Sequence, residues 1–198
     1  MGYAQSDGFH FNSFAEFLEF EKHSEIRYEF YNGEVFAMAG TTIIHNLLVG
    51  RMRDLIREKF APRGCYTLTE SVKLEAIKDQ YYPYPDLMLT CHELDKQERY
   101  IVKNPVLIAE VLSKSTAEAD RYFKWQRYKK IPSLQYYLLI SQYEVLTEIF
   151  SRTDQPETWL YQSFDQPMDQ IKLSAIDFTL SVGDMYDGIT LLPPEENE

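Results

Sequence analysis

One short apolar run constrains the fold of this chain more than any other feature. Residues 106–112 read Val-Leu-Ile-Ala-Glu-Val-Leu and do not alternate between apolar and polar positions. Such a run is typical of a β-strand buried on both faces of a sheet. Its single charge is Glu110, and an ionised carboxylate there costs several kcal/mol unless it is paired or binds a metal. We therefore expect Glu110 to be either an ion-pair partner or a functional group.

Helices and strands are expected on both sides of this run. Ser13 with Glu16 is typical of a capping box, and Asn32-Gly33 lies between two alternating runs, which predicts a hairpin. Ser115 with Glu118 predicts a second capping box. The expected helices are 14–23, 41–60 and 115–130, with a last helical turn at 183–186. The expected strands and extended stretches are 27–31, 34–38, 65–75, 85–91, 106–112, 134–140, 145–151, 158–163 and a piece near 171.

The composition favours one soluble domain. The chain has 198 residues, of which 44% are apolar, enough for one sizeable core. We expect a single domain over 1–198 with flexible ends at 1–11 and 193–198. No apolar run approaches the roughly 18 residues of a membrane span, and the first residues do not resemble a signal peptide. Cys65 and Cys91 are too few and too isolated to predict a disulfide framework or a zinc site, so a reducing, cytoplasmic setting is expected.

The charge is distributed unevenly. Residues 144–198 carry 12 acidic and two basic side chains, a net charge of −10, whereas the whole chain has a net charge of −11. An acidic chain ordinarily binds nucleic acid poorly, yet the remainder is nearly neutral and holds two basic clusters. Each cluster is either a solvated helix face or one wall of a phosphate-facing groove. The clusters are Arg51, Arg53, Arg57, Lys59 and Arg63, and Lys114, Arg121, Lys124, Arg127, Lys129 and Lys130.

Two further residues are candidates for chemistry beside Glu110. Asp86 begins the strand that follows Pro85, and on adjoining strands Asp86 and Glu110 would offer two oxygen ligands to a hard cation such as Mg²⁺. We expect their carboxylates within about 6 Å of each other, and a raised pKa for one of them, favouring Glu110. Lys124 is four residues after Asp120, which by itself predicts a helical salt bridge. A catalytic Lys124 would instead approach Asp86 or Glu110 more closely than Asp120.

Other patterns predict no site. The chain has no glycine-rich phosphate loop, and its histidines lack the spacing of metal ligands. Ser113, Ser115 and Thr116 are interpreted as turn and cap residues, because no nucleophile elbow surrounds them. His45, beside the apolar stripe of its helix, is interpreted as a packed or boundary histidine.

The order and spacing of several motifs resemble the Uma2 family, also called DUF820, a group of restriction endonuclease-like proteins. The motifs are Pro85-Asp86, Ala109-Glu110-Val-Leu-Ser113-Lys-Ser-Thr116, Asp120-Arg121-x-x-Lys124 and Tyr128. The N-terminal signature of the family is similar to Arg27-Tyr-Glu29, Gly33-Glu34, Met38 and His45. The resemblance extends from about Ser13 to Tyr186.

This resemblance implies an α/β (α+β) fold of the PD-(D/E)xK nuclease type, a mixed β-sheet flanked by helices. An N-terminal helix plus β-hairpin and a C-terminal β-meander would complete it. Asp86 and Glu110 match the metal carboxylates, and the Val111 backbone carbonyl matches the usual third ligand, for Mg²⁺ or Mn²⁺. Leu112 stands where the motif commonly carries its lysine, which makes Lys124 on the following helix the candidate. Glu29 and His45 match family positions without a derived role and are further candidates.

The leading hypothesis is a Mg²⁺-dependent endonuclease that cleaves DNA, with Lys124 positioning the attacking water. The main alternative is a catalytically degenerate member that serves as a binding or interaction module, which the acidic C-terminal quarter favours. A third is a hydrolase of another phosphoester. A homodimer is expected, since two-fold symmetry suits duplex DNA.

Overall fold

The computed structural model describes residues 8–38 and 40–193. Within this part of the chain, no helix is long and apolar enough to cross a membrane. The helices are α1 (Phe14–Glu21), α2 (Ile43–Phe60), α3 (Glu93–Gln97), α4 (Trp125–Tyr128) and α5 (Val182–Tyr186), with 3₁₀ turns η1 (Ala61–Arg63) and η3 (Ser174–Ile176) and a π-helical segment η2 (Ala119–Lys124). The strands are β1 (Tyr28–Tyr31), β2 (Glu34–Ala37), β3 (Tyr66–Thr69), β4 (Lys73–Leu74), β5 (Tyr81–Tyr82), β6 (Leu87–Thr90), β7 (Ile101–Val102), β8 (Leu107–Leu112), β9 (Tyr136–Ser141), β10 (Thr147–Arg152), β11 (Trp159–Phe164), β12 (Gln170–Leu173) and β13 (Phe178–Ser181).

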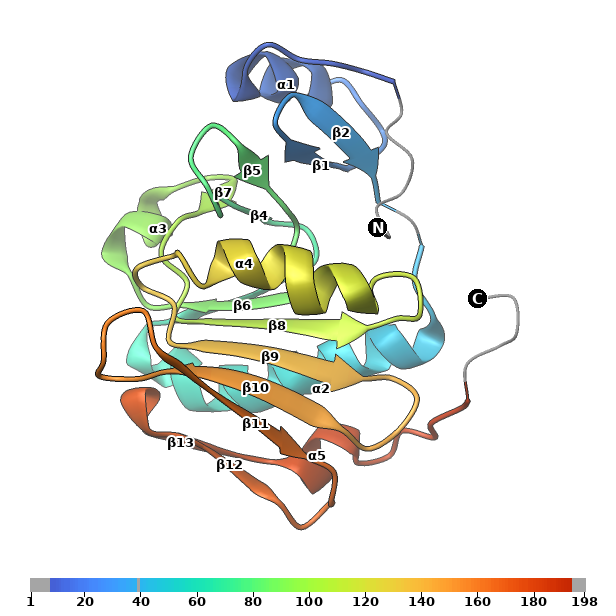
Figure 1. Ribbon diagram of the computed structural model, residues 1–198, viewed down its shortest axis with the longest axis vertical. Coiled ribbons are helices and arrows are strands. Elements are labelled where there is room, and N and C mark those ends of the chain that lie inside the picture. Colours follow the sequence, from blue (N-terminus) through green and yellow to red (C-terminus); the bar gives the residue numbers. More distant parts are fainter. Residues whose placement is uncertain (1–7, 39, 194–198) are drawn as a thin grey trace.

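A mixed six-stranded sheet in the order β11-β10-β9-β8-β6-β3 forms the centre (Figure 1). Strand β8 pairs in parallel with β9 and antiparallel with β6, and every residue of β8 is buried. This confirms the strand expected from the apolar run, because a strand with helices on both sides needs apolar residues on both faces.

Helices cover both faces of the sheet. Alternate residues of β8 pack on opposite sides: Leu107 and Ala109 join the core under α2, whereas Ile108 and Leu112 join the core that includes Tyr128 of α4. In Figure 1, α4 lies in front of the sheet and α2 behind it. Because side chains alternate along a strand, Glu110 points to the α4 side.

The N-terminal helix and hairpin are present as expected. Ser13 accepts the Glu16 N–H at the start of α1, and β1 and β2 pair around Asn32-Gly33. Strand β5 joins them in a separate three-stranded sheet above α4 (Figure 1). An aromatic core fills this region, built from Phe11, Phe14, Phe17, Tyr28, Phe30 and Tyr82.

The segments expected to be flexible are only partly described. Residues 1–7 and 194–198 lie outside the described residues, while the Phe11 N–H donates to the Gly33 carbonyl at 2.8 Å. A single domain over 1–198 stays a prediction.

The capping box expected at Ser115 and Glu118 is not formed. Ser113 Oγ instead accepts the Thr116 N–H at 3.1 Å, and a π-helical segment follows from Ala119. Wider π turns frequently occur at functional sites, where they redirect side chains.

The expectation of two isolated cysteines was wrong. Cys65 and Cys91 form a disulfide between Cα atoms 4.2 Å apart. The reason is register: β3 and β6 pair with Tyr66 opposite Thr90, so the next residues outward, Cys65 and Cys91, also face each other. The two cysteines therefore do not indicate a reducing compartment, and the cytoplasmic setting stays a prediction.

Candidate active site

Strands β6 and β8 bring Asp86 and Glu110 side by side. Leu87 pairs with Ala109, so the preceding Asp86 lies beside Glu110. The Asp86 N–H donates to Glu110 Oε2 at 3.3 Å, and the Val111 N–H donates to Asp86 Oδ2 at 2.7 Å. The expected juxtaposition of the two carboxylate-bearing residues is present, held by two backbone donors.

Lys124 reaches this position from the helix above the sheet. Its Nζ lies 3.0 Å from Glu110 Oε1 and 2.9 Å from Asp120 Oδ1. The expectation that Lys124 would approach Glu110 more closely than Asp120 is not met, because the ammonium lies between the two carboxylates. It is nevertheless no surface salt bridge, since only 12% of the Lys124 side chain and 2% of each carboxylate side chain are exposed.

A buried tyrosine completes this charged group. The Tyr128 hydroxyl donates to Glu110 Oε1 at 3.0 Å, the same oxygen that Lys124 contacts. The Tyr137 hydroxyl donates to the Asp120 carbonyl at 3.1 Å and so ties the π-helical segment to β9. Glu110 Oε1 is thus committed to protein contacts, while Oε2 accepts a long bond from Asp86 N–H.

Burial and neighbouring charges together shift the pKa values of these groups. Burial raises the pKa of Glu110 well above its usual range, and the charges of Asp86 and Asp120 add to this against the opposing effect of Lys124. Burial acts to lower the pKa of Lys124, but the charges of Asp120 and Glu110 outweigh it and raise that pKa. The raised pKa expected for Glu110 is confirmed.

His45 belongs to the same group of side chains. It lies in the first turn of α2, whose N-cap Thr42 accepts the His45 N–H, and its Nε2 is 3.1 Å from Asp86 Oδ2. Burial acts to lower the pKa of His45, but the hydrogen bond and charge of Asp86 and the charge of Glu70 outweigh it and raise that pKa. The interpretation of His45 as only a packed histidine therefore misses its contact with Asp86.

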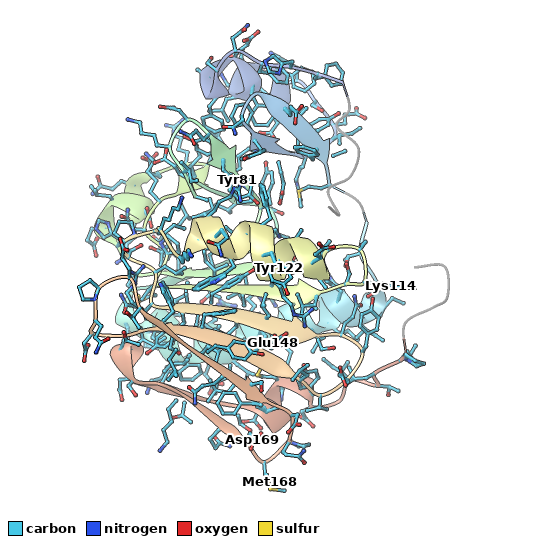
Figure 2. All side chains as sticks on the ribbon, in the orientation of Figure 1. Tyr81, Lys114, Tyr122, Glu148, Met168 and Asp169 are labelled. Carbon is cyan, nitrogen blue, oxygen red and sulfur yellow. A yellow bond between two sulfur atoms is a disulfide. The ribbon has the colours of Figure 1, made fainter. Side chains whose placement is uncertain are left out.

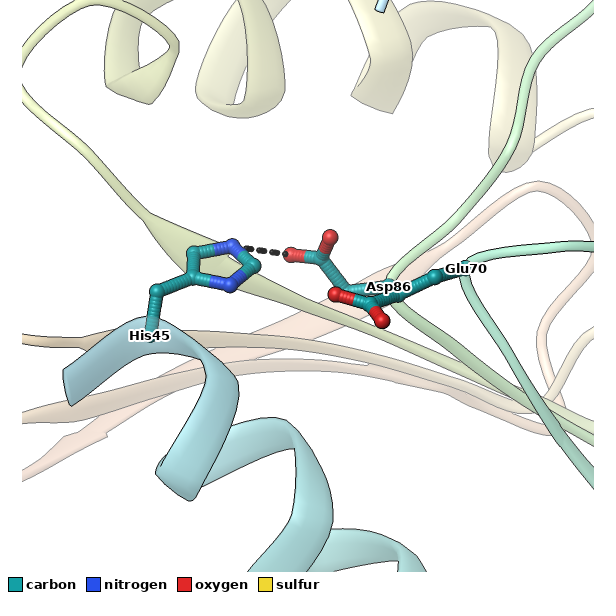
Figure 3. A group of neighbouring side chains, drawn as sticks. All are labelled: His45, Glu70 and Asp86. Carbon is teal, nitrogen blue, oxygen red and sulfur yellow. Dashed lines mark ion pairs between the residues drawn. The ribbon is translucent and has the colours of Figure 1, made fainter. Parts of the chain in front are cut away.

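Glu70 was missed by the sequence reasoning. His45, Glu70 and Asp86 offer ligand atoms that all lie within 4.8 Å of one another (Figure 3). Glu70 follows β3 with a positive φ of 44°, and its N–H donates to the Asp86 carbonyl at 3.3 Å. Nothing in the local sequence marks Glu70, because its place opposite Asp86 follows from the β3–β6 register.

Glu29 lies on β1 and contacts the chain segment just before Asp86. Its Oε1 accepts the Tyr84 N–H at 3.3 Å. Burial raises the pKa of Glu29, while the charge of Lys124 opposes this rise. The positive charge of Lys124 therefore stabilises the ionised form of Glu29.

Acidic side chains pair with many members of the two basic clusters. On α2, Arg51 pairs with Asp187 at 3.2 Å and Arg63, just after the helix, with Asp177 at 3.1 Å. On the α4 side, Arg121 pairs with Glu148 of β10, which is labelled in Figure 2. The acidic C-terminal quarter therefore neutralises part of the basic charge that was considered for a phosphate-facing groove.

Comparison with known proteins shows the family and the fold of this chain. The family model Uma2, described as "Putative restriction endonuclease", matches residues 14–183. Two uncharacterized proteins of Synechocystis sp. are similar to this chain. One is 29% identical, and the match covers 88% of this chain and 90% of the relative. The other is 33% identical, and the match covers 74% of this chain and 83% of the relative. The crystal structure of a "putative nuclease belonging to DUF820" from Anabaena variabilis superimposes with a TM-score of 0.69 at 16% identity, over 88% of this chain and 97% of that one, and shows the same fold. The chain belongs to the Uma2 family.

Proposed function

We propose that this protein is an endonuclease that hydrolyses phosphodiester bonds in DNA with Mg²⁺ or Mn²⁺. One observation carries the proposal: a buried lysine, Lys124, lies 3.0 Å from Glu110, which adjoins Asp86 on the neighbouring strand. Two neighbouring carboxylates can hold a divalent cation, and an ammonium beside them can stabilise the charge of a phosphate group. Membership of a family described as "Putative restriction endonuclease" supports it.

The roles follow from the contacts. Asp86 and Glu110 Oε2 would hold the cation, with the Val111 carbonyl as a further proposed ligand. When bound, a divalent cation stabilises charge on the scissile phosphate and lowers the pKa of a water ligand. Lys124 positions the attacking water and offsets phosphate charge from its place beside Glu110. Tyr128 and the Asp86 N–H keep the Glu110 carboxylate in one orientation.

Plasmid cleavage tests the proposal. Purified protein is incubated with supercoiled plasmid and Mg²⁺ or Mn²⁺, with and without chelator, and nicked and linear products are quantified. Wild type is compared with Glu110→Gln, Lys124→Met and Lys124→Arg. Losing one charge-stabilising group typically costs on the order of 10²-fold in rate or more, so the first two variants should be nearly inactive.

A matched control is Lys22→Met, which removes an exposed lysine that pairs with Glu19 at i,i+3. Circular dichroism establishes whether each variant is folded. If Lys124→Met does not fold, Lys124→Arg still tests the role of Lys124, because it keeps the buried positive charge. Equal cleavage by all variants would mean a contaminating nuclease. Absence of cleavage by wild type on plasmid and on a simple phosphodiester would favour the binding-module alternative. The homodimer stays a prediction that sedimentation analysis would check.

A further inference from the structure

Three potential metal ligands meet at one end of the strand pair β3–β6. This pair runs from Tyr66 opposite Thr90 to Thr69 opposite Leu87. The disulfide closes the end beyond Tyr66, and Glu70 and Asp86 are the next residues beyond the other end. His45 approaches this end from the start of α2, a different element. The backbone of all three residues is thus held by regular structure or by its hydrogen bonds.

The ligand atoms have the spacing that one cation requires. One atom from each of His45, Glu70 and Asp86 lies within 4.8 Å of the others. Ligands at about 2.0–2.6 Å from a shared ion are separated by up to roughly twice that distance. Figure 3 shows the edge of the imidazole that carries both nitrogens facing the two carboxylates. Nothing has to move far for the three to share an ion.

A second, independent observation points to a ligand. The Nδ1 atom of His45 is buried and, among residues 8–38 and 40–193, has no hydrogen-bond partner. The exposed fraction of the His45 side chain is only 9%, so bulk water does not satisfy this nitrogen freely. A buried polar atom without a partner is energetically costly, and a bound ligand would recover that cost.

We propose that His45, Glu70 and Asp86 bind a divalent transition-metal ion, such as Mn²⁺, in preference to Mg²⁺. Imidazole nitrogen suits first-row transition metals, whereas Mg²⁺ prefers an all-oxygen shell with several waters. Two carboxylates beside the imidazole supply the negative charge and the remaining ligands. The inference rests on the proposed function in one respect. Asp86 belongs both to the group His45, Glu70 and Asp86 and to the carboxylate pair Asp86 and Glu110, so the ion would lie in the same site.

Metal binding, measured without any substrate, tests this inference. Chelator-treated protein is titrated calorimetrically with Mn²⁺ and separately with Mg²⁺. Wild type should bind Mn²⁺ about tenfold or more tightly than Mg²⁺, and His45→Gln should lose about tenfold or more of the Mn²⁺ affinity together with the discrimination. Glu70→Gln should also weaken Mn²⁺ binding. His23→Gln is the matched control, because His23 is exposed and contacts only Glu19 at 3.8 Å among the described ion pairs.

A spectroscopic signature separates ligation from a structural effect. Pulsed electron paramagnetic resonance of bound Mn²⁺ should show coupling to one imidazole ¹⁴N, which disappears in His45→Gln and persists in Glu70→Gln and His23→Gln. If His45→Gln does not fold, the ¹⁴N coupling in wild type and the Mn²⁺ affinity of Glu70→Gln still test the proposed metal site.

The inference and the proposed function fail separately. Unchanged Mn²⁺ affinity in both His45→Gln and Glu70→Gln, absence of the ¹⁴N coupling, or equal affinity for Mn²⁺ and Mg²⁺ in wild type would overturn the metal site, even where plasmid is cleaved. Mn²⁺ binding with the expected coupling, but no cleavage under any condition, would support the metal site and overturn the nuclease proposal.

Discussion

At the scale of single residues, one ammonium balances two buried carboxylates. Lys124 contacts Glu110 and Asp120, and each of these acids is only 1% exposed. Breaking a buried pair by removing one partner is far more costly than losing a surface pair, because it leaves an uncompensated charge without water.

Lys124→Met should therefore lower the free energy of unfolding by about 3 kcal/mol at pH 7. Lys22→Met should leave it nearly unchanged, because both side chains of its ion pair are about two-thirds exposed. Urea denaturation followed by circular dichroism measures both values. Equal stability of the two variants would show that the Lys124 contacts contribute no more than a surface pair.

Lys73 is a second buried cation with a different consequence. Its Nζ contacts Glu21 at 2.6 Å and the Tyr28 carbonyl at 3.0 Å, and lies over the Tyr84 ring. Burial lowers the pKa of Lys73 to about 8, against the opposing effect of Glu21. Between that pKa and the unfolded value of 10.5, the unfolded chain binds more protons at Lys73 than the folded one.

The Lys73 contribution to the free energy of unfolding should accordingly rise with pH above about 8. Relative to Lys73→Met, wild type should gain about 1 kcal/mol between pH 7 and pH 9, since one pKa unit corresponds to about 1.4 kcal/mol. Urea denaturation of both proteins at the two pH values checks this. A wild-type gain no larger than that of Lys73→Met would mean that the Lys73 pKa is not lowered.

At the scale of elements, the strand pair β3–β6 is closed covalently at one end. The Cys65–Cys91 disulfide bridges residues 26 apart in sequence, so it limits the conformations of the unfolded chain. Replacing both cysteines by serine should lower the free energy of unfolding by about 3 kcal/mol. A reducing agent should destabilise wild type by a similar amount and leave the double variant unchanged. If the reducing agent affects neither protein, the two cysteines are not bonded.

At the scale of the whole molecule, the acidic C-terminal quarter lies against the basic face of α2. Arg51 and Arg63 pair with Asp187 and Asp177, whose side chains are 74% and 91% exposed. Exposed pairs contribute little to stability, so the double change Asp177→Asn with Asp187→Asn should leave the melting temperature nearly unchanged. It lowers the net negative charge by two and removes the carboxylate partner of each guanidinium, while Arg51 and Arg63 keep their hydrogen bonds to the backbone carbonyls of Asp184 and Ile176.

DNA binding is where this double variant should differ from wild type. Affinity for a duplex should rise several-fold, and the salt dependence should steepen by up to about 0.9 for each phosphate newly contacted. Fluorescence anisotropy with a labelled duplex at several salt concentrations measures both quantities. Unchanged affinity and slope would place the DNA away from α2.

Local patterns determined much of this molecule. Capping by Thr42 sets the start of α2, turn chemistry sets the hairpin at Asn32-Gly33, and a run of apolar residues sets the buried strand through Glu110. All three act between near neighbours in the sequence. The motif spacing was also sufficient to identify the Uma2 family. Adjoining strands for Asp86 and Glu110 were a hypothesis, which the pairing of β6 with β8 confirms.

Tertiary structure alone decided which side chains meet. The short elements α3, β5, β7 and β13 were not expected, because so few residues carry little periodicity and form only against neighbours already in place. Glu70 reaches Asp86, and Cys65 reaches Cys91, through the register of β3 and β6, which depends on pairing between segments distant in sequence. The π-helical segment placed Lys124 between Glu110 and Asp120 rather than beside one of them. Sequence determined which residues could take part in chemistry, and packing determined which of them share a site, because contact is a property of the folded chain.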